Sequence, residues 1–204
     1  MLFDDTFLTV KQRTEAVYTD KGSKFIAFTF PITAEGDIKP LLLQLKALHP
    51  KANHHCWAMR LTADRSVFKV NDDGEPSGTA GRPILNVLLS KNITNTLVVV
   101  VRYFGGRLLG VPGLINAYKT ATEQVITFAG VTEQISNDVY HIEFDYLLMN
   151  DVMRIIKEEG LTILIQTADN TCSITIEVRK SKVNKTMDRL NSLSNIQAKF
   201  LHSS

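Results

Sequence analysis

An unbroken apolar run from Leu97 to Val101 constrains the fold of this chain more than any other feature. Consecutive β-branched residues indicate a central strand covered on both faces, because a half-exposed strand would alternate apolar with polar side chains. A glycine-rich loop follows from Phe104 to Gly113, and then an apolar stripe at helical spacing, made of Leu114, Ala117, Tyr118, Ala121, Val125 and Ile126. We therefore predict a buried strand, a loop and a helix. A ligand site is expected at the carboxyl end of the strand, as in open α/β sheets.

The loop after this strand is purely cationic. Between Asn95 and Thr122 the charged residues are Arg102, Arg107 and Lys119, with no carboxylate among them. Glycine allows positive φ and close backbone approach, and the start of the next helix adds a partial positive charge. The segment predicts an anion site formed by Arg82, Arg102, Tyr103, Gly105, Gly106, Arg107, Gly110 and Lys119. The alternative is a tight structural turn whose arginines pair with nearby carboxylates.

A polar turn from Asn71 to Arg82 precedes the strand and carries Asp72, Asp73 and Glu75, together with Ser77 and Thr79. These carboxylates could hold Mg²⁺ next to a bound phosphate. They could instead pair with arginines or cap the following helix, which is the interpretation we favour. Ser77 lacks the Gly-x-Ser-x-Gly setting of an activated hydroxyl. We expect this acidic turn and the cationic loop to face each other across one cleft.

His54, His55 and Cys56 begin another predicted strand, on which His54 and Cys56 share one face. Imidazole and thiolate are zinc ligands, but no second Cys/His pair lies nearby to complete a site. A histidine that lines the groove and a buried thiol are the simpler interpretation. We predict no metal, no cofactor and no catalytic residue.

The segments His54-His55-Cys56, Asp72 to Pro83, Val99 to Gly106, and Leu109-Gly110 with Gly113-Leu114 and Ala117-Tyr118 closely resemble the YigZ/IMPACT family. The resemblance covers roughly residues 14 to 130. It implies a first domain like the second domain of ribosomal protein S5. It also implies a ferredoxin-like second domain similar to the last domain of elongation factor G. The fold class is then α+β, with domains at 1–132 and 137–204.

The pattern after Ile135 agrees with that implication, since it predicts elements in the order β, α, β, β, α, β. The last predicted helix carries a basic cluster, Lys182, Lys185 and Arg189, which fits either a solvated helix face or contact with an RNA backbone.

Composition limits the function only weakly. The net charge of +2 does not by itself argue for nucleic acid. The first residues lack a signal-peptide pattern and no stretch is long enough to span a bilayer, so we expect a cytoplasmic protein without membrane contact.

We predict a non-catalytic RNA- or ribosome-binding protein linked to regulation of translation, without sequence-specific DNA binding. Tyr103, Phe104 or Trp57 would stack on bases where they are exposed. The first alternative is an enzyme acting on a phosphorylated or anionic small molecule. The second is a regulator that binds a protein partner in translational control.

Overall fold

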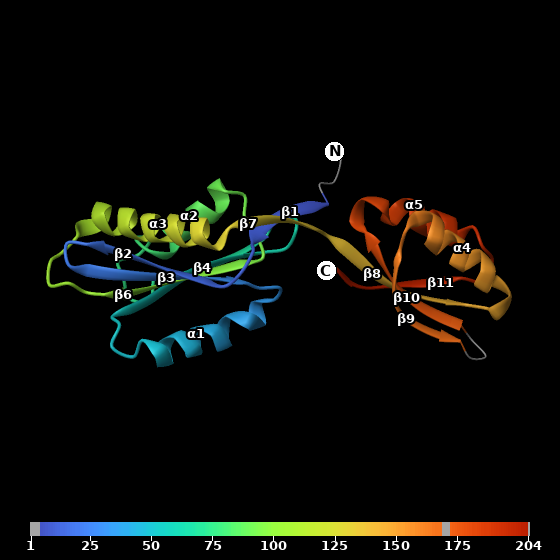
Figure 1. The fold of residues 1–204 in the computed structure, drawn as a ribbon, viewed down its shortest axis with the longest axis horizontal. Helices are drawn as coiled ribbons and strands as arrows, with labels where there is room; N and C mark the ends of the chain where they lie inside the picture. The colour runs from blue at the N-terminus through green and yellow to red at the C-terminus, as the bar shows by residue number, and fades with distance from the viewer. Residues whose placement is uncertain (1–4, 169–171, 204) are drawn as a thin grey trace. The chain divides into compact units, whose positions relative to one another are not determined.

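A computed structural model describes residues 5–168 and 172–203 of the chain (Figure 1). Two compact units emerge. Residues 7–134 form the first unit, and residues 5–6 together with the described residues from 135 onward form the second. Strands β1 (Thr6–Val10) and β7 (Val131–Ile135) pair in a two-stranded sheet. No helix among these residues is long and apolar enough to cross a membrane.

The first unit is built on a five-stranded sheet in the order β2-β3-β6-β4-β5. Its strands are β2 (Thr14–Asp20), β3 (Ser23–Pro31), β4 (His54–Leu61), β5 (Val67–Asn71) and β6 (Thr96–Tyr103). The strand predicted from the apolar run is central β6, as expected. Every neighbouring pair is antiparallel, so the rule for parallel α/β sheets that suggested the ligand edge does not apply here.

Helices cover both faces of this sheet, as Figure 1 shows. Helix α1 (Ile38–Leu48) lies on one face, and α2 (Gly81–Ser90) and α3 (Gly110–Ala129) lie on the other. Alternate residues of β6 belong to the two hydrophobic cores, one on each face of the sheet. Val98 and Val100 pack toward α2 and α3, whereas Leu97, Val99 and Val101 belong to the core under α1. Burial on both faces explains why no polar residue interrupts the run.

The start of α1 is not set by the nearest residue of a common N-cap type, Thr33. A 3-10 turn (Glu35–Asp37) comes between Thr33 and the helix. The side chain of Asp37 accepts hydrogen bonds from the backbone N–H groups of Thr33 and Ala34. Leu48 lies in the last turn of α1 and is exposed.

The second unit contains β8 (Asn137–Phe144), α4 (Met149–Glu159), β9 (Thr162–Ala168), β10 (Cys172–Arg179), α5 (Val183–Asn191) and β11 (Gln197–Ser203). The 3-10 turns Tyr146–Leu148 and Lys180–Lys182 precede its two helices. This is the predicted element order, in an antiparallel sheet ordered β11-β8-β10-β9. The core includes Ile142, Ile155, Ile174 and Leu190. Only Ser136 separates β7 from β8 where a linker was expected.

Gly105 should be far more sensitive to substitution than its neighbour Gly106. A Cβ on Gly105 would lie 1.9 Å from the carbonyl carbon of Gly22, in the turn between β2 and β3. Gly106 has φ +81° and open space around it. We expect Gly105→Ala to lower the free energy of unfolding by about 3 kcal/mol or more, and Gly106→Ala by about 1 kcal/mol. Equal losses in urea unfolding would contradict the close-approach explanation.

Asp5 should stabilise the second unit in a pH-dependent way. Arg179 donates two hydrogen bonds to its buried carboxylate, at 2.6 and 2.9 Å. These bonds, with one from Ser181, hold the pKa of Asp5 well below its usual range. A lowered folded-state pKa stabilises at pH values above the unfolded pKa of about 3.9, and this contribution is lost on acidification.

We expect Asp5→Asn to lower the free energy of unfolding by about 1–2 kcal/mol at pH 7. The difference from wild type should shrink as the pH falls through about 4. Thermal unfolding followed by circular dichroism between pH 7 and pH 3 measures both quantities. Asp151→Asn, which removes a more exposed pair with Arg154, is the control and should change stability little. A difference that grows on acidification would refute this account.

Candidate functional site

The candidate site lies where three strand ends of the first unit meet. The register of the sheet pairs His54, at the start of β4, with Arg102, near the end of β6. Strand β5 runs antiparallel to β4 and ends at Asn71, opposite Trp57. The acidic turn that follows β5 is therefore brought to the end of β6, although the sheet is not parallel.

The carboxylate of Asp72 caps the N-terminus of α2. Its Oδ1 accepts hydrogen bonds from the backbone N–H groups of Ala80 (3.1 Å) and Gly81 (2.8 Å), and its Oδ2 accepts one from Gly78 (2.9 Å). A carboxylate at this position satisfies orphan donors and complements the helix dipole. The capping role proposed as an alternative to metal binding is the one observed for Asp72.

Asp73 fixes the two histidines of β4. Its Oδ2 accepts a hydrogen bond of 2.7 Å from the backbone N–H of His55, and its carbonyl oxygen lies 2.8 Å from Nδ1 of His54. Because a carbonyl only accepts, Nδ1 of His54 carries a hydrogen. The other nitrogen, Nε2, faces Oε1 of Glu75 at 3.9 Å, beyond hydrogen-bond distance. Burial lowers the pKa of His55.

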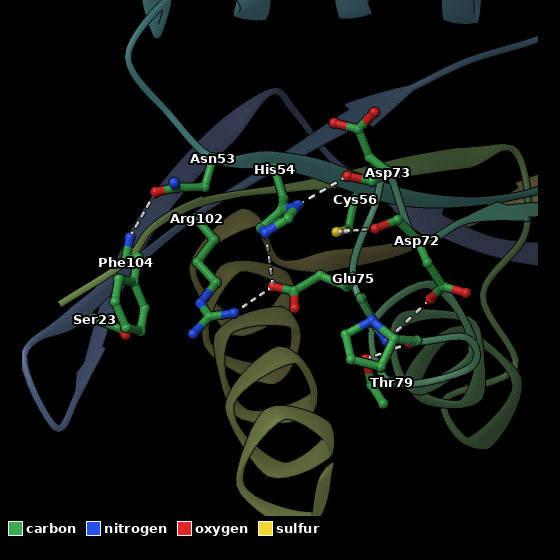
Figure 2. A network of polar contacts seen from close by, with 12 residues as sticks. Ser23, Asn53, His54, Cys56, Asp72, Asp73, Glu75, Thr79, Arg102 and Phe104 are labelled. Atoms are coloured by element: carbon green, nitrogen blue, oxygen red, sulfur yellow. Dashed lines mark hydrogen bonds and ion pairs between the residues drawn. The ribbon is translucent and has the colours of Figure 1, made fainter. Parts of the chain in front are cut away.

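Glu75 is the centre of the network drawn in Figure 2. Its Oε1 accepts hydrogen bonds from Nη1 of Arg102 at 2.6 Å and from the hydroxyl of Tyr118 at 2.7 Å. The side chains of Glu75 and Arg102 are only 3% and 7% exposed. Arg102 also lies over the rings of Phe25 and Phe104, at 5.5 and 5.7 Å. Where a cleft was expected, the acidic turn and the end of β6 are joined by a buried ion pair.

Tyr118 and Cys56 are further buried members of this network. Burial raises the pKa of the Tyr118 hydroxyl and of the Cys56 thiol. The thiol donates to the carbonyl oxygen of Asp72 at 3.0 Å and lies 3.3 Å from the hydroxyl of Tyr118. Cys56 is therefore a neutral, buried thiol, and this environment does not generate a nucleophilic thiolate.

The rest of the acidic turn carries no activated hydroxyl. Thr79 is buried and donates through Oγ1 to the carbonyl oxygen of Pro76 at 2.6 Å. Ser77 is exposed to solvent. Among residues 5–168 and 172–203 no three His, Cys, Asp or Glu side chains come close enough to form a candidate metal site.

The cationic loop is held to the sheet through its backbone. The N–H of Phe104 donates to Oδ1 of Asn53 at 2.8 Å, and the N–H of Gly105 donates to Oγ of Ser23 at 3.2 Å. Gly106 and Gly110 adopt positive φ. Tyr103 points to the opposite face of the sheet, where its hydroxyl lies 3.0 Å from Nδ1 of His49. Tyr103 is therefore separated from the Glu75 network.

Three predicted cations of the first unit remain at the surface. Arg107 in the loop and Arg82 in the first turn of α2 are exposed. Lys119 on α3 is exposed as well, and its Nζ lies 3.9 Å from Oε1 of Glu123. Their surroundings differ from that of Arg102, whose charge is compensated inside the domain.

The basic cluster of the second unit is engaged with the end of α4. Lys185 and Arg189 form ion pairs with the buried Glu159, and Arg189 also contacts Glu158. Lys182 donates to the carbonyl oxygen of Glu159 at 3.1 Å. Hydrogen bonds from Arg189 and Lys185 lower the pKa of Glu159. The three predicted cations thus also join α5 to α4.

The sequence prediction missed Tyr118, Phe25, Ser23 and Asn53 as parts of the site. Tyr118 was placed in the apolar stripe of α3, where it does lie fully buried. Its hydroxyl was the available signal, because a buried tyrosine usually needs a polar partner. Ser23 and Asn53 act on the loop through long-range backbone contacts that no local pattern reveals.

The Glu75–Arg102 pair should be essential for stability, and its two members should be strongly coupled. We expect Glu75→Ala to lower the free energy of unfolding by about 3–5 kcal/mol, because Arg102 remains buried without a counter-charge. The double variant Glu75→Leu with Arg102→Met should lose much less than the sum of the two single losses. Glu123→Ala, at an exposed pair, is the control. Additive losses in chemical denaturation would show that the pair is not coupled.

Comparisons with known proteins agree with this architecture. The sequence profile of the Impact N-terminal domain matches residues 21–126. The IMPACT family member YvyE of Bacillus subtilis is 34% identical over 153 residues, which is 75% of this chain and 70% of that protein. The IMPACT family member YigZ of Escherichia coli is 34% identical over 128 residues, covering 62% of this chain and 63% of YigZ.

A solved structure has the same overall fold. The crystal structure of a hypothetical protein aligns with 97% of this chain and 98% of its own, at a TM-score of 0.73 and 26% sequence identity. The Glu75 network lies within the matched N-terminal region, since Phe25, Arg102 and Tyr118 all fall between residues 21 and 126. From the profile match and the identity to YvyE, the chain belongs to the IMPACT family.

Proposed function

We propose that this protein binds RNA or ribosomes without catalysing a reaction, and that it acts in the regulation of translation. The translational context comes from the family to which the chain belongs. We further propose that the first unit has the fold of the second domain of ribosomal protein S5. For the second unit we propose a ferredoxin-like fold. Its element order and its β11-β8-β10-β9 strand order support that assignment.

The proposal rests on one observation: Arg102 is neutralised inside the domain, whereas the other predicted cations of the first unit are exposed. Glu75 neutralises Arg102 inside the domain, whereas Arg107, Arg82 and Lys119 keep their charges at the surface. No carboxylate lies between Asn95 and Thr122 to compensate the loop. We propose that Arg102 positions the loop and that the three exposed cations contact phosphates.

Phe104 can add contacts to bases. It is roughly half exposed and lies directly before the two loop glycines, and its backbone N–H is fixed by Asn53. An exposed aromatic ring next to cations is a typical stacking platform for single-stranded nucleic acid. In the second unit, Lys185 is 70% exposed and is the cluster member best placed for a further phosphate contact.

A second candidate function is binding of a partner protein, and one observation favours it. Leu108, before α3, and Val111 and Ile115, in its first two turns, are exposed at helical spacing. Leu108 is 85% exposed, and exposed apolar side chains that lie together are more typical of interaction sites than single ones. A partner that covers these residues would also lie beside Arg107. The enzyme alternative has less support, because Asp72 and Glu75 are both engaged in internal contacts.

The RNA proposal predicts a change in salt dependence. We expect the triple variant Arg82→Ala, Arg107→Ala, Lys119→Ala to bind single-stranded RNA more weakly. Its log–log salt slope should be smaller by about 0.7 for each phosphate that the variant no longer binds. Fluorescence anisotropy with a labelled RNA between 50 and 200 mM salt, roughly the range in which such binding is most salt-sensitive, provides the measurement.

A matched control removes equal charge from other exposed sites. Lys51→Ala, Lys91→Ala, Lys157→Ala should leave the slope and the affinity nearly unchanged. An identical slope in the two triple variants would contradict the phosphate contacts. Wild-type protein that binds neither RNA nor ribosomal fractions at low salt would contradict the proposed function itself.

A further inference from the structure

A groove separate from the Glu75 network runs between α1 and the edge of the sheet. Its volume is about 410 Å³. Ile38, Leu42, Leu43 and Trp57 supply its apolar lining, and Lys39, Lys46 and Lys69 lie around it. Leu43 is exposed on the helix side. The groove is thus mainly apolar inside, with lysines from both of its walls.

One wall of the groove is an edge strand. Strand β5 ends the sheet order and pairs with β4 alone. On its free side, an edge strand presents N–H and C=O groups that can pair with another extended chain. The first turn of α2 lies against Asn71, because a Cβ on Gly81 would come within 2.9 Å of the Asn71 nitrogen. The same Cβ would come within 3.1 Å of the Cβ of Val70, so the part of the edge away from α2 is residues 67–69.

Exposed apolar side chains flank this edge on the face away from α1. The register places Lys69 opposite Met59, which belongs to the core under α1, so Lys69 faces the groove. Phe68 and Val70 alternate with it and lie on the other face, 51% and 40% exposed. A chain added to β5 would contact the groove on one face and these two residues on the other.

The charges around the groove favour an acidic occupant. Lys69 forms an ion pair with Glu35, and Nζ of Lys46 lies 3.8 Å from Oδ1 of Asp73. Lys39 makes no ion pair with any residue that the structure describes. Three lysines and one glutamate line the groove, so a carboxylate-bearing ligand would meet complementary charge.

We propose that the groove between α1 and β5 binds an extended segment of a partner protein that carries both apolar residues and Asp or Glu at every second position, on the face that it turns toward α1. The segment adds to the free edge of β5 as a further strand, and its main chain supplies hydrogen bonds. On that face its apolar side chains enter the groove beside Leu42 and Trp57, and its carboxylates meet the lysines. A polypeptide fits this site better than RNA, because the regular N–H and C=O pattern of β5 complements another peptide backbone.

The chain carries its own probe for this site. Trp57 is the only tryptophan of the protein and lines the groove, so its fluorescence reports on occupancy. Random decapeptides displayed on phage are selected on the immobilised full-length protein, and the enriched peptides are synthesised. We expect them to carry apolar and acidic residues together at positions i, i+2 and i+4, to change the emission of Trp57, and to bind more weakly as salt increases.

Substitutions test whether the selected peptides bind in the groove between α1 and β5. Leu43→Asp and the pair Lys39→Glu with Lys46→Glu alter exposed side chains of α1, and each should weaken peptide binding by tenfold or more. Val17→Asp, on the opposite edge strand β2, and Lys91→Glu, after α2, are controls that should leave binding unchanged. Circular dichroism of every variant tests that the fold is intact. Hydrogen exchange should show new protection of amides among residues 67–69 in the complex.

Four outcomes would overturn the proposal. The first is a selection that yields no peptide above background, or peptides without acidic residues. The second is binding that survives Leu43→Asp and the charge reversal. The third is self-association of the wild type in sedimentation that Leu43→Asp abolishes, since a second copy would then cover the groove. Competition by RNA for the same site, with loss of the Trp57 response, would assign the groove to nucleic acid instead.

Discussion

Burying a carboxylate is unfavourable unless its charge is matched, and the first unit is organised around the way Glu75 meets this requirement. Arg102 supplies the counter-charge from the end of β6, and Tyr118 supplies a hydroxyl from α3. Both bonds end on one oxygen atom of a turn that lies between β5 and α2. Three segments remote in sequence are thereby fixed to one another, and the cationic loop begins directly after the arginine that is held.

The Glu75–Arg102 ion pair gives Arg102 a different role from Arg107, although the sequence alone could not distinguish the two arginines. Arg102 and Arg107 belong to one cationic segment with similar local composition. The sheet register sets Arg102 against His54 and aims its side chain toward α3, while Arg107 lies beyond the last strand residue in an exposed loop. Which arginine is neutralised inside the protein therefore depends on a strand-pairing register, and no local pattern encodes that register.

Much of the fold could be predicted, because periodicity records burial. The apolar run of β6, the alternation of β4 and the β, α, β, β, α, β order of the second unit all followed from patterns of 2.0 or 3.6 residues. Strand direction could not be predicted in this way. A run covered on both faces suggested a parallel sheet, yet helices on both sides bury an antiparallel strand equally well. Thr33 was a plausible helix cap by type, but Asp37 provides the hydrogen bonds instead.

The division of the chain into units has a consequence for how such a protein can be dissected. Asp5 belongs to the same unit as Arg179, so the second unit takes its residues from both ends of the chain and the polypeptide passes between units twice. A fragment starting at Asn137 would lack a buried carboxylate that its own arginine binds. The second unit is therefore not made of C-terminal residues alone. Recombination that transfers this unit to another protein would also have to transfer the short N-terminal segment that contains Asp5.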